Sequence, residues 1–99
     1  MSQGIVENKV GSVEETQIYL KAFPLRTLEE LPAIKKDLSE RMIIILRITP
    51  LVQKNVDELR RAVEELYEFA VSIGGDIARL GEERVVITPP GVKIWRGLE

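Results

Sequence analysis

The fold of this chain is constrained most by one continuous pattern, which spans residues 56–90. It begins with an amphipathic stretch whose apolar side chains recur at helical spacing, which predicts one long helix. Asn55 followed by Glu58 predicts the N-terminal cap of that helix, and a Gly-Gly pair marks its end. The remainder predicts two short strands, 76–80 and 84–88, joined by a tight glycine turn. The run as a whole therefore indicates a mixed α/β domain.

Two strands and a second helix are expected before this run. Residues 17–23 alternate between two faces, which predicts a first strand that Pro24 ends. Thr27 begins a plausible capping box, and an apolar stripe predicts a helix from there to about Ser39, although Pro32 favours a separate or kinked first turn. Residues 41–48 predict a second strand, and its residues 42–46 are apolar without alternation, which is typical of a strand buried on both faces.

The expected element order gives a single domain with one sheet. A turn at 89–91 should lead into a last short strand at 92–96. The order β-α-β-α-β-β-β predicts an α+β sandwich, with one mixed sheet of about five strands and two helices on one face. We interpret residues 1–16 as a flexible tail, 17–97 as the folded domain, and 98–99 as a possible remnant of cloning.

Composition excludes several classes of function. The chain has 99 residues, 44% of them hydrophobic and 30% charged, with a net charge of −2, which argues against a broad nucleic-acid-binding surface. It has no cysteine and no histidine, so it lacks thiol nucleophiles, zinc–thiolate sites and the commonest general base. Phosphate-binding glycine motifs are also absent from the sequence. We therefore expect no catalytic residue, no metal site and no cofactor, and a protein that is not an enzyme.

The sequence shows no obvious membrane segment. Its longest apolar run, 42–46, is far shorter than the ~18 residues of a spanning helix. Residues 1–16 lack both a signal-peptide core and the basic amphipathic pattern of a helix that lies on a membrane. We expect this chain as given not to bind lipid.

Two regions carry more apolar surface than one such domain can bury. The apolar stripe of the long helix is about twice as wide as a usual core-facing stripe, and the strand at 42–46 needs cover on both faces when two helices can cover one. One interpretation is that some of these side chains are simply exposed. The interpretation that we favour is a homodimer. The interface residues expected on this basis are Ala62, Leu66, Tyr67, Phe69 and Ile44.

The sequence of residues 56–90 resembles that of the cell-division protein family SepF. The resemblance covers residues 17–96 and is strongest at the IGGDI motif of 73–77, the RLG of 79–81 and the VITP of 86–89. It implies a cytoplasmic dimer that binds the C-terminal tail peptide of the tubulin-like protein FtsZ in a groove shared by two protomers. It also implies recruitment to the inner face of the membrane at the division site through an N-terminal amphipathic helix, which this chain does not show.

Two departures from the bacterial pattern make the chain more similar to the archaeal branch of the family. Tyr67 and Glu68 replace a glycine and a small residue associated with ring assembly, and Val85 replaces a bulky aromatic residue. The basic position is kept as Arg79. By resemblance, the peptide should contact a group of strand and helix residues. These are Ile77, Arg79, Val85, Ile87, Phe69 and Ile73.

Two other classes remain open at this point. A small nucleic-acid-binding dimer of the Alba-like type has a similar element order, but it needs a basic arm where residues 81–83 are acidic. A ligand-sensing regulatory dimer needs a polar pocket at its interface, which a sequence cannot show.

Overall fold

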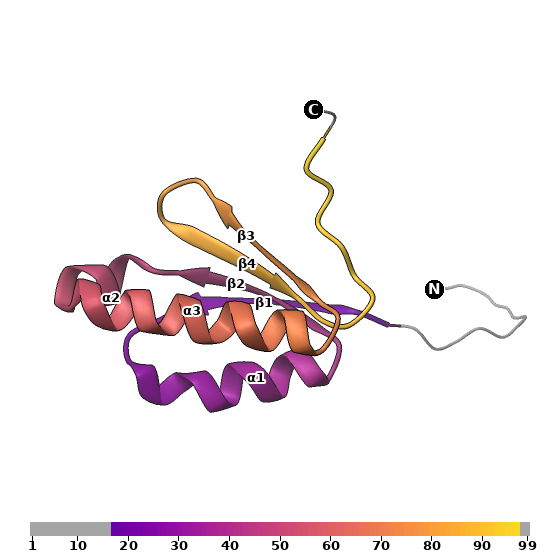
Figure 1. Cartoon of the computed structure of the whole chain (residues 1–99), viewed down its shortest axis with the longest axis horizontal. Coiled ribbons are helices and arrows are strands. Elements are labelled where there is room, and N and C mark those ends of the chain that lie inside the picture. Colours follow the sequence, from indigo (N-terminus) through magenta and orange to yellow (C-terminus); the bar gives the residue numbers. More distant parts are fainter. Residues whose placement is uncertain (1–16, 98–99) are drawn as a thin grey trace, which may run out of the picture.

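The computed structural model describes residues 17–97, which form a four-stranded mixed sheet with helices on one face. The strand order is β1-β2-β4-β3. Strand β1 (Tyr19–Pro24) runs parallel to β2 (Met42–Arg47), and β4 (Arg84–Thr88) lies antiparallel between β2 and β3 (Asp76–Leu80). Figure 1 shows the two longer helices on the same side of the sheet. The predicted α+β class, with helices on one face, is confirmed.

The helix α3 (Val56–Ser72) begins and ends where the sequence predicted. The Oδ1 of Asn55 accepts a hydrogen bond from the backbone N–H of Glu58 at 3.0 Å, which satisfies one of the free donors of the first turn. Gly74 follows the helix with a φ of 78°, a left-handed conformation that glycine adopts without strain. Local sequence signals alone therefore fix both ends of this helix.

The region before β2 has a more detailed structure than the sequence indicated. A 3-10 turn, Leu28–Glu30, precedes the helix α1 (Leu31–Ser39), so that Pro32 falls in the first turn of α1, where no N–H donor is needed. The Oγ1 of Thr27 accepts from the N–H of Glu29, and the carboxylate of Glu30 accepts from the N–H of Arg26. The predicted capping box is thus present in a variant form.

A short helix, α2 (Thr49–Lys54), was not predicted. Thr49 and Pro50 follow directly after the strand predicted at 41–48, and proline suits the first turn of a helix. Leu51 of this helix is fully buried, so α2 closes one end of the core before α3 begins.

The core lies between the sheet and the helices α1 and α3. Alternation places Ile44 and Leu46 of β2 on the covered face, where both are buried, and Ile43 and Ile45 on the opposite face, where both are partly exposed. The strand was expected to need cover on both faces, and this chain covers one of them. The fully or almost fully buried apolar side chains of the core include Leu25, Leu31, Ile34, Leu38, Ile44, Leu46, Leu51, Ala62, Leu66, Ala70, Val85 and Ile87.

The expected fifth strand is absent, so the prediction of about five strands is wrong by one. Residues 92–96 lie beside the start of β3 but form no ladder with it. The reason is that the outward-facing backbone groups of Ile77 are bound by side chains: its N–H donates to the Asp76 carboxylate, and its carbonyl accepts from Arg96. Side-chain hydrogen bonds thus replace the backbone ladder that a strand requires.

The predictions for the two termini, a flexible tail at 1–16 and a cloning remnant at 98–99, lie outside the described residues. Among residues 17–97, no helix is long and apolar enough to cross a membrane.

Candidate functional site

The sequence motif at 74–77 builds a junction between α3 and the sheet. Gly74 turns the chain out of the helix, and its carbonyl accepts a hydrogen bond from the N–H of Gly91 at 3.1 Å. Gly75 lies against β4 so closely that an added Cβ would stand 2.1 Å from the carbonyl oxygen of Thr88. Gly74 is therefore required because of its left-handed backbone conformation, and Gly75 because there is no space for a side chain.

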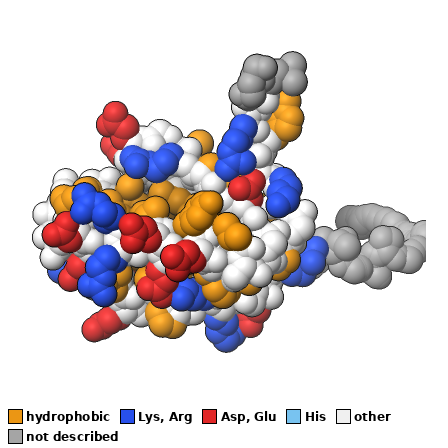
Figure 2. All heavy atoms as spheres, viewed as in Figure 1, with side chains coloured by type: hydrophobic (Ala, Val, Ile, Leu, Met, Phe, Trp, Pro, Cys, Tyr) orange, Lys and Arg blue, Asp and Glu red, His pale blue; other side chains and the backbone are white. Residues whose placement is uncertain are grey.

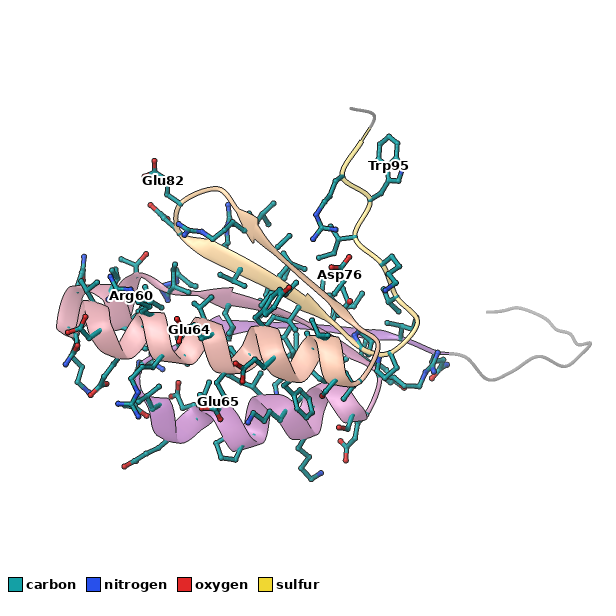
Figure 3. The ribbon with its side chains drawn as sticks, viewed as in Figure 1. Arg60, Glu64, Glu65, Asp76, Glu82 and Trp95 are labelled. Atoms are coloured by element: carbon teal, nitrogen blue, oxygen red, sulfur yellow. The ribbon has the colours of Figure 1, made fainter. Side chains whose placement is uncertain are left out.

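Asp76 is the polar centre of this junction. Its carboxylate accepts hydrogen bonds from the backbone N–H groups of Ile77 and Ile94, each at 2.9 Å, and from both terminal nitrogens of Arg96, at 3.0 and 3.1 Å. These donors, the Arg96 guanidinium first among them, hold the pKa of the Asp76 carboxyl well below its usual range. Figure 3 shows Asp76 facing the C-terminal segment. We call residues 92–96 the strap.

Thr88 completes the attachment of the strap. It is 2% exposed and its hydroxyl accepts from the N–H of Asp76 at 2.8 Å while it donates to the carbonyl of Val92 at 2.6 Å. Burying a hydroxyl is unfavourable unless it is hydrogen-bonded, and here both functions of the group are used. The motif residues Gly75, Asp76 and Thr88 are therefore explained by the joining of α3, β3, β4 and the strap.

Two adjoining hollows lie along the side of the molecule where α3 faces β3. The smaller, of about 220 Å³, lies toward the middle of both elements, and the larger, of about 390 Å³, lies between the end of α3 and the strap. They share Tyr67 and Ile77 as lining residues, and we call them together the groove. Figure 2 shows hydrophobic side chains gathered on this side of the molecule. The smaller hollow is lined by Val63, Tyr67, Ile77, Ala78, Arg79 and Val85.

The charged groups of the groove are mostly cationic. Arg79 lines the smaller hollow, and Lys93 and Arg96 line the larger one. The only carboxylate among the lining residues is that of Asp76, which is already bound to Arg96. Arg79 donates to the carbonyl of Glu82 at 3.2 Å, and neither it nor Lys93 forms an ion pair within residues 17–97. An apolar groove with two uncompensated cations is suited to a ligand that is apolar and anionic.

The residues expected to bind a peptide are only partly brought together. Ile77, Arg79 and Val85 line the groove. Ile87 is fully buried in the core, so no ligand can reach it in this conformation. The remaining two, Phe69 and Ile73, are partly buried against the core and line neither hollow. Contact of these six residues with a peptide stays a prediction.

The residues expected at a dimer interface are also divided. Ala62, Leu66 and Ile44 are 0%, 1% and 0% exposed, because they form the contact between α3 and the sheet within one chain. They are not available to a partner. Tyr67 is 56% exposed and lines the groove, and Phe69 packs partly against the core with the Lys35 ammonium 5.5 Å from its ring centroid. The interface as a whole stays a prediction.

The apolar surface that remains uncovered lies on the other face of the sheet. The strand registers place one side chain or more from every strand on that face, at the positions opposite to the core. These residues are Leu20, Ala22, Ile43, Ile45, Ala78, Leu80 and Val86. Leu20 is 65% exposed and Leu80 is 46% exposed, so this face is an open apolar surface.

Sequence reasoning missed several residues of the groove. Tyr67 was placed in the dimer stripe, and Val63 received no role beyond that stripe, although their spacing of four puts them on one helix face. Lys93 and Arg96 were overlooked because the strap was expected to be an ordinary strand. Trp95 is 81% exposed, and Figure 3 shows it pointing away from the body of the protein.

The described part of the chain contains no cluster of three or more carboxylates that could hold a metal ion. Glu64, Glu65 and Glu68 of α3 are exposed, and Glu65 forms an ion pair with Lys35 of α1 at 2.6 Å. The structure thus uses this glutamate to join two helices.

Comparison with known proteins identifies the family. Residues 21–94 match the family model described as cell division protein SepF. The chain is similar to the solved structure of a SepF-like protein from Archaeoglobus fulgidus, with a TM-score of 0.75 and 29% identity over 83% of this chain and 98% of that one. A SepF-like protein from Pyrococcus furiosus gives a TM-score of 0.74 and 29% identity over 84% and 100%. A comparison with curated protein sequences found no match. The chain belongs to the SepF family of cell-division proteins.

Proposed function

We propose that this protein is a non-enzymatic cell-division adaptor that binds the C-terminal tail peptide of FtsZ in the groove between α3 and β3. Membership of a cell-division family supports the cellular role. The observation that carries the peptide site is the groove itself, in which Arg79 stands beside Val63, Tyr67 and Ile77 at the open edge of the sheet. Such a surface offers apolar pockets, a cation and a strand edge together.

The strand edge supports this proposal because part of it is free. The backbone of Asp76 faces β4, where its N–H and carbonyl both contact the Thr88 hydroxyl, so the backbone of Ile77 faces outward. By alternation, the N–H and carbonyl of Arg79 also face outward, and no strand lies beyond β3 within the described sheet. An extended peptide added there would gain backbone hydrogen bonds at Arg79 while its side chains entered the smaller hollow.

The proposed adaptor acts as a homodimer in the cytoplasm. We assign the dimer contact to the open face of the sheet, because that face exposes contiguous aliphatic residues of all four strands, whereas the core-facing residues of α3 are already buried. Such extended apolar faces are uncommon on monomers. A dimer doubles the number of peptide sites, which would strengthen attachment to a filament that presents many tails. Recruitment to the membrane at the division site would require an N-terminal helix outside the described residues.

Titration of a fluorescently labelled FtsZ tail peptide tests the site. Wild-type protein should bind the peptide, and Arg79→Glu should weaken the affinity at least about tenfold, which corresponds to about 1.4 kcal/mol. Arg61→Glu is the matched control, since it reverses an exposed charge of α3 that lines neither hollow. A protein that does not bind the tail, or that binds it equally well with Arg79→Glu, would contradict the proposed site.

A further inference from the structure

The strap forms one side of the larger hollow. Tyr67 and Val71 of α3 line that hollow from one side, and Lys93 and Arg96 line it from the strap. The hollow adjoins the smaller one at Tyr67 and Ile77. A ligand seated at Arg79 that extends toward Ile77 therefore reaches the strap.

The strap also determines where the open edge of the sheet ends. At Ile77 the outward N–H donates to Asp76 and the carbonyl accepts from Arg96 at 2.8 Å, so both edge groups are already used. At Arg79, one edge position further along, the outward groups remain free. A peptide strand that pairs at Arg79 cannot continue along the edge past Ile77. Its next residues must leave the sheet, and the larger hollow adjoins that point at Ile77.

The charge of the larger hollow indicates what those residues should carry. The Asp76 carboxylate is fully occupied by Arg96 and two backbone N–H groups, whereas Lys93 is exposed and forms no ion pair in the described part of the chain. Lys93 is thus an uncompensated cation that lines a hollow of mixed polar and apolar residues, in a chain whose net charge is −2. A carboxylate is the group that complements it.

We propose that the strap is the second wall of the peptide groove, and that Lys93 binds a carboxylate of an extended peptide that leaves the edge of β3 at Ile77. The Asp76–Arg96 ion pair is the positioning element, because it holds Lys93 at the rim of the hollow. This inference rests on the proposed function, since it concerns the same peptide and the same groove.

The strap is held mainly by polar contacts, so it can be released by a substitution that leaves the core intact. The side chains of Lys93, Trp95 and Arg96 are exposed, and the attachment depends on hydrogen bonds from Ile94 and Arg96 to Asp76 and from Thr88 to Val92. Loss of the Arg96 guanidinium should therefore free the strap without opening the core. Trp95 is the single tryptophan of the chain, so its fluorescence anisotropy reports the mobility of the strap directly.

The experiment compares the peptide affinities of Lys93→Glu, Lys93→Ala and the control Lys54→Glu, all measured with the labelled FtsZ tail. Lys54 is an exposed lysine at the end of α2 that lines neither hollow. Lys93→Glu should weaken binding about tenfold, which corresponds to about 1.4 kcal/mol, and Lys93→Ala about threefold. Lys54→Glu should bind like the wild type. Peptides in which each acidic residue in turn is replaced by its amide, and one with an amidated C-terminus, should identify a single carboxylate whose removal abolishes the effect of Lys93→Ala.

The positioning role of Arg96 is tested by a double substitution. Arg96→Gln should raise the mobility of Trp95 and weaken peptide binding, and it should have little further effect when Lys93→Ala is already present. A merely structural role would weaken binding equally in both backgrounds.

The outcomes separate this inference from the proposed function. If Lys93→Glu binds as tightly as the wild type while Arg79→Glu binds weakly, the strap is not part of the site and the proposed function stands. If no acidic group of the peptide couples to Lys93, the assignment of a carboxylate partner is overturned. Failure of the wild-type protein to bind the tail overturns the proposed function and this inference together.

Discussion

Asp76 and Arg96 form a two-pronged ion pair across 20 residues of sequence, with nitrogen-to-oxygen distances of 3.0 and 3.1 Å. This pair and the hydrogen bonds around it join the start of β3 to the end of the described chain. It occupies the position where a fifth strand was expected, and it closes the edge of β3 at Ile77. One carboxylate thus limits the sheet to four strands and at the same time positions one wall of the groove.

Asp76→Asn should destabilise the protein. Asparagine is neutral, so the ion pair with Arg96 is lost. Both carboxylate oxygens of Asp76 accept hydrogen bonds, whereas the side-chain amide of asparagine has one accepting oxygen and one NH2 group that can only donate. Hydrogen bonds to charged groups contribute about 1.5–3 kcal/mol, and we expect a loss of about 2 kcal/mol in the free energy of unfolding. Urea unfolding followed by circular dichroism measures it. Asp57→Asn is the control, because Asp57 pairs only with exposed Arg60 at 3.0 Å, and its loss should be much smaller.

The contribution of Asp76 should also depend on pH. The pKa of its carboxyl is lower in the folded protein than in the unfolded chain, so the folded state favours the ionised form. Its contribution is complete above the unfolded pKa of about 3.9 and is lost as the pH falls below that value toward the folded pKa. The difference in unfolding free energy between wild type and Asp76→Asn should therefore be constant from neutral pH to about pH 5 and shrink below about pH 4. A difference that grows on acidification would contradict this sign.

Gly75→Ala should destabilise the protein more than Gly74→Ala does. The added methyl at Gly75 would stand 2.1 Å from the carbonyl oxygen of Thr88, so the helix and the sheet must move apart. We expect a cost of about 3 kcal/mol, at the upper end of the range for overpacking. At Gly74 there is free space, and the cost of about 1 kcal/mol comes from the left-handed backbone. Thermal unfolding of the two variants measures the difference, and equal losses would show that Gly75 is not packed as described.

Ile45→Glu should dissociate the proposed dimer. Ile45 lies on the open face of the sheet, so a charge there would be buried without a partner between two copies. Sedimentation velocity should show dimers for the wild type and monomers for Ile45→Glu at micromolar concentration. Val56→Glu, at an exposed apolar position of α3, should remain dimeric.

Tyr67→Glu distinguishes the two possible faces of the dimer. Tyr67 was expected at the interface from the width of the helical stripe, but it lies in the groove. If the sheet forms the contact, Tyr67→Glu should weaken peptide binding and leave the dimer intact. If Tyr67→Glu is a monomer while Ile45→Glu remains a dimer, the dimer interface lies on α3 and not on the sheet.

Local chemistry allowed the sequence to predict most of the secondary structure. The ends of α3 follow from the side chain of Asn55 and the φ of Gly74, and the hairpin of β3 and β4 follows from a glycine turn between two short strands. These signals act over a few residues, so they can be recognised in the sequence without knowledge of the rest of the fold. The motif of 73–77 could identify the family for a related reason. Its glycines and its aspartate are required by the junction between α3 and the sheet.

Only the tertiary structure decided which apolar residues are used inside the chain and which remain outside. The wide stripe of α3 does not reveal that Ala62 and Leu66 are buried against the sheet while Tyr67 lines a groove, because the rotation of a helix on a sheet depends on packing across the whole interface. The same holds for the strap. Its sequence is compatible with a strand, but the Asp76 carboxylate, brought close by the ends of α3 and β4, competes for its donors and prevents a ladder from forming.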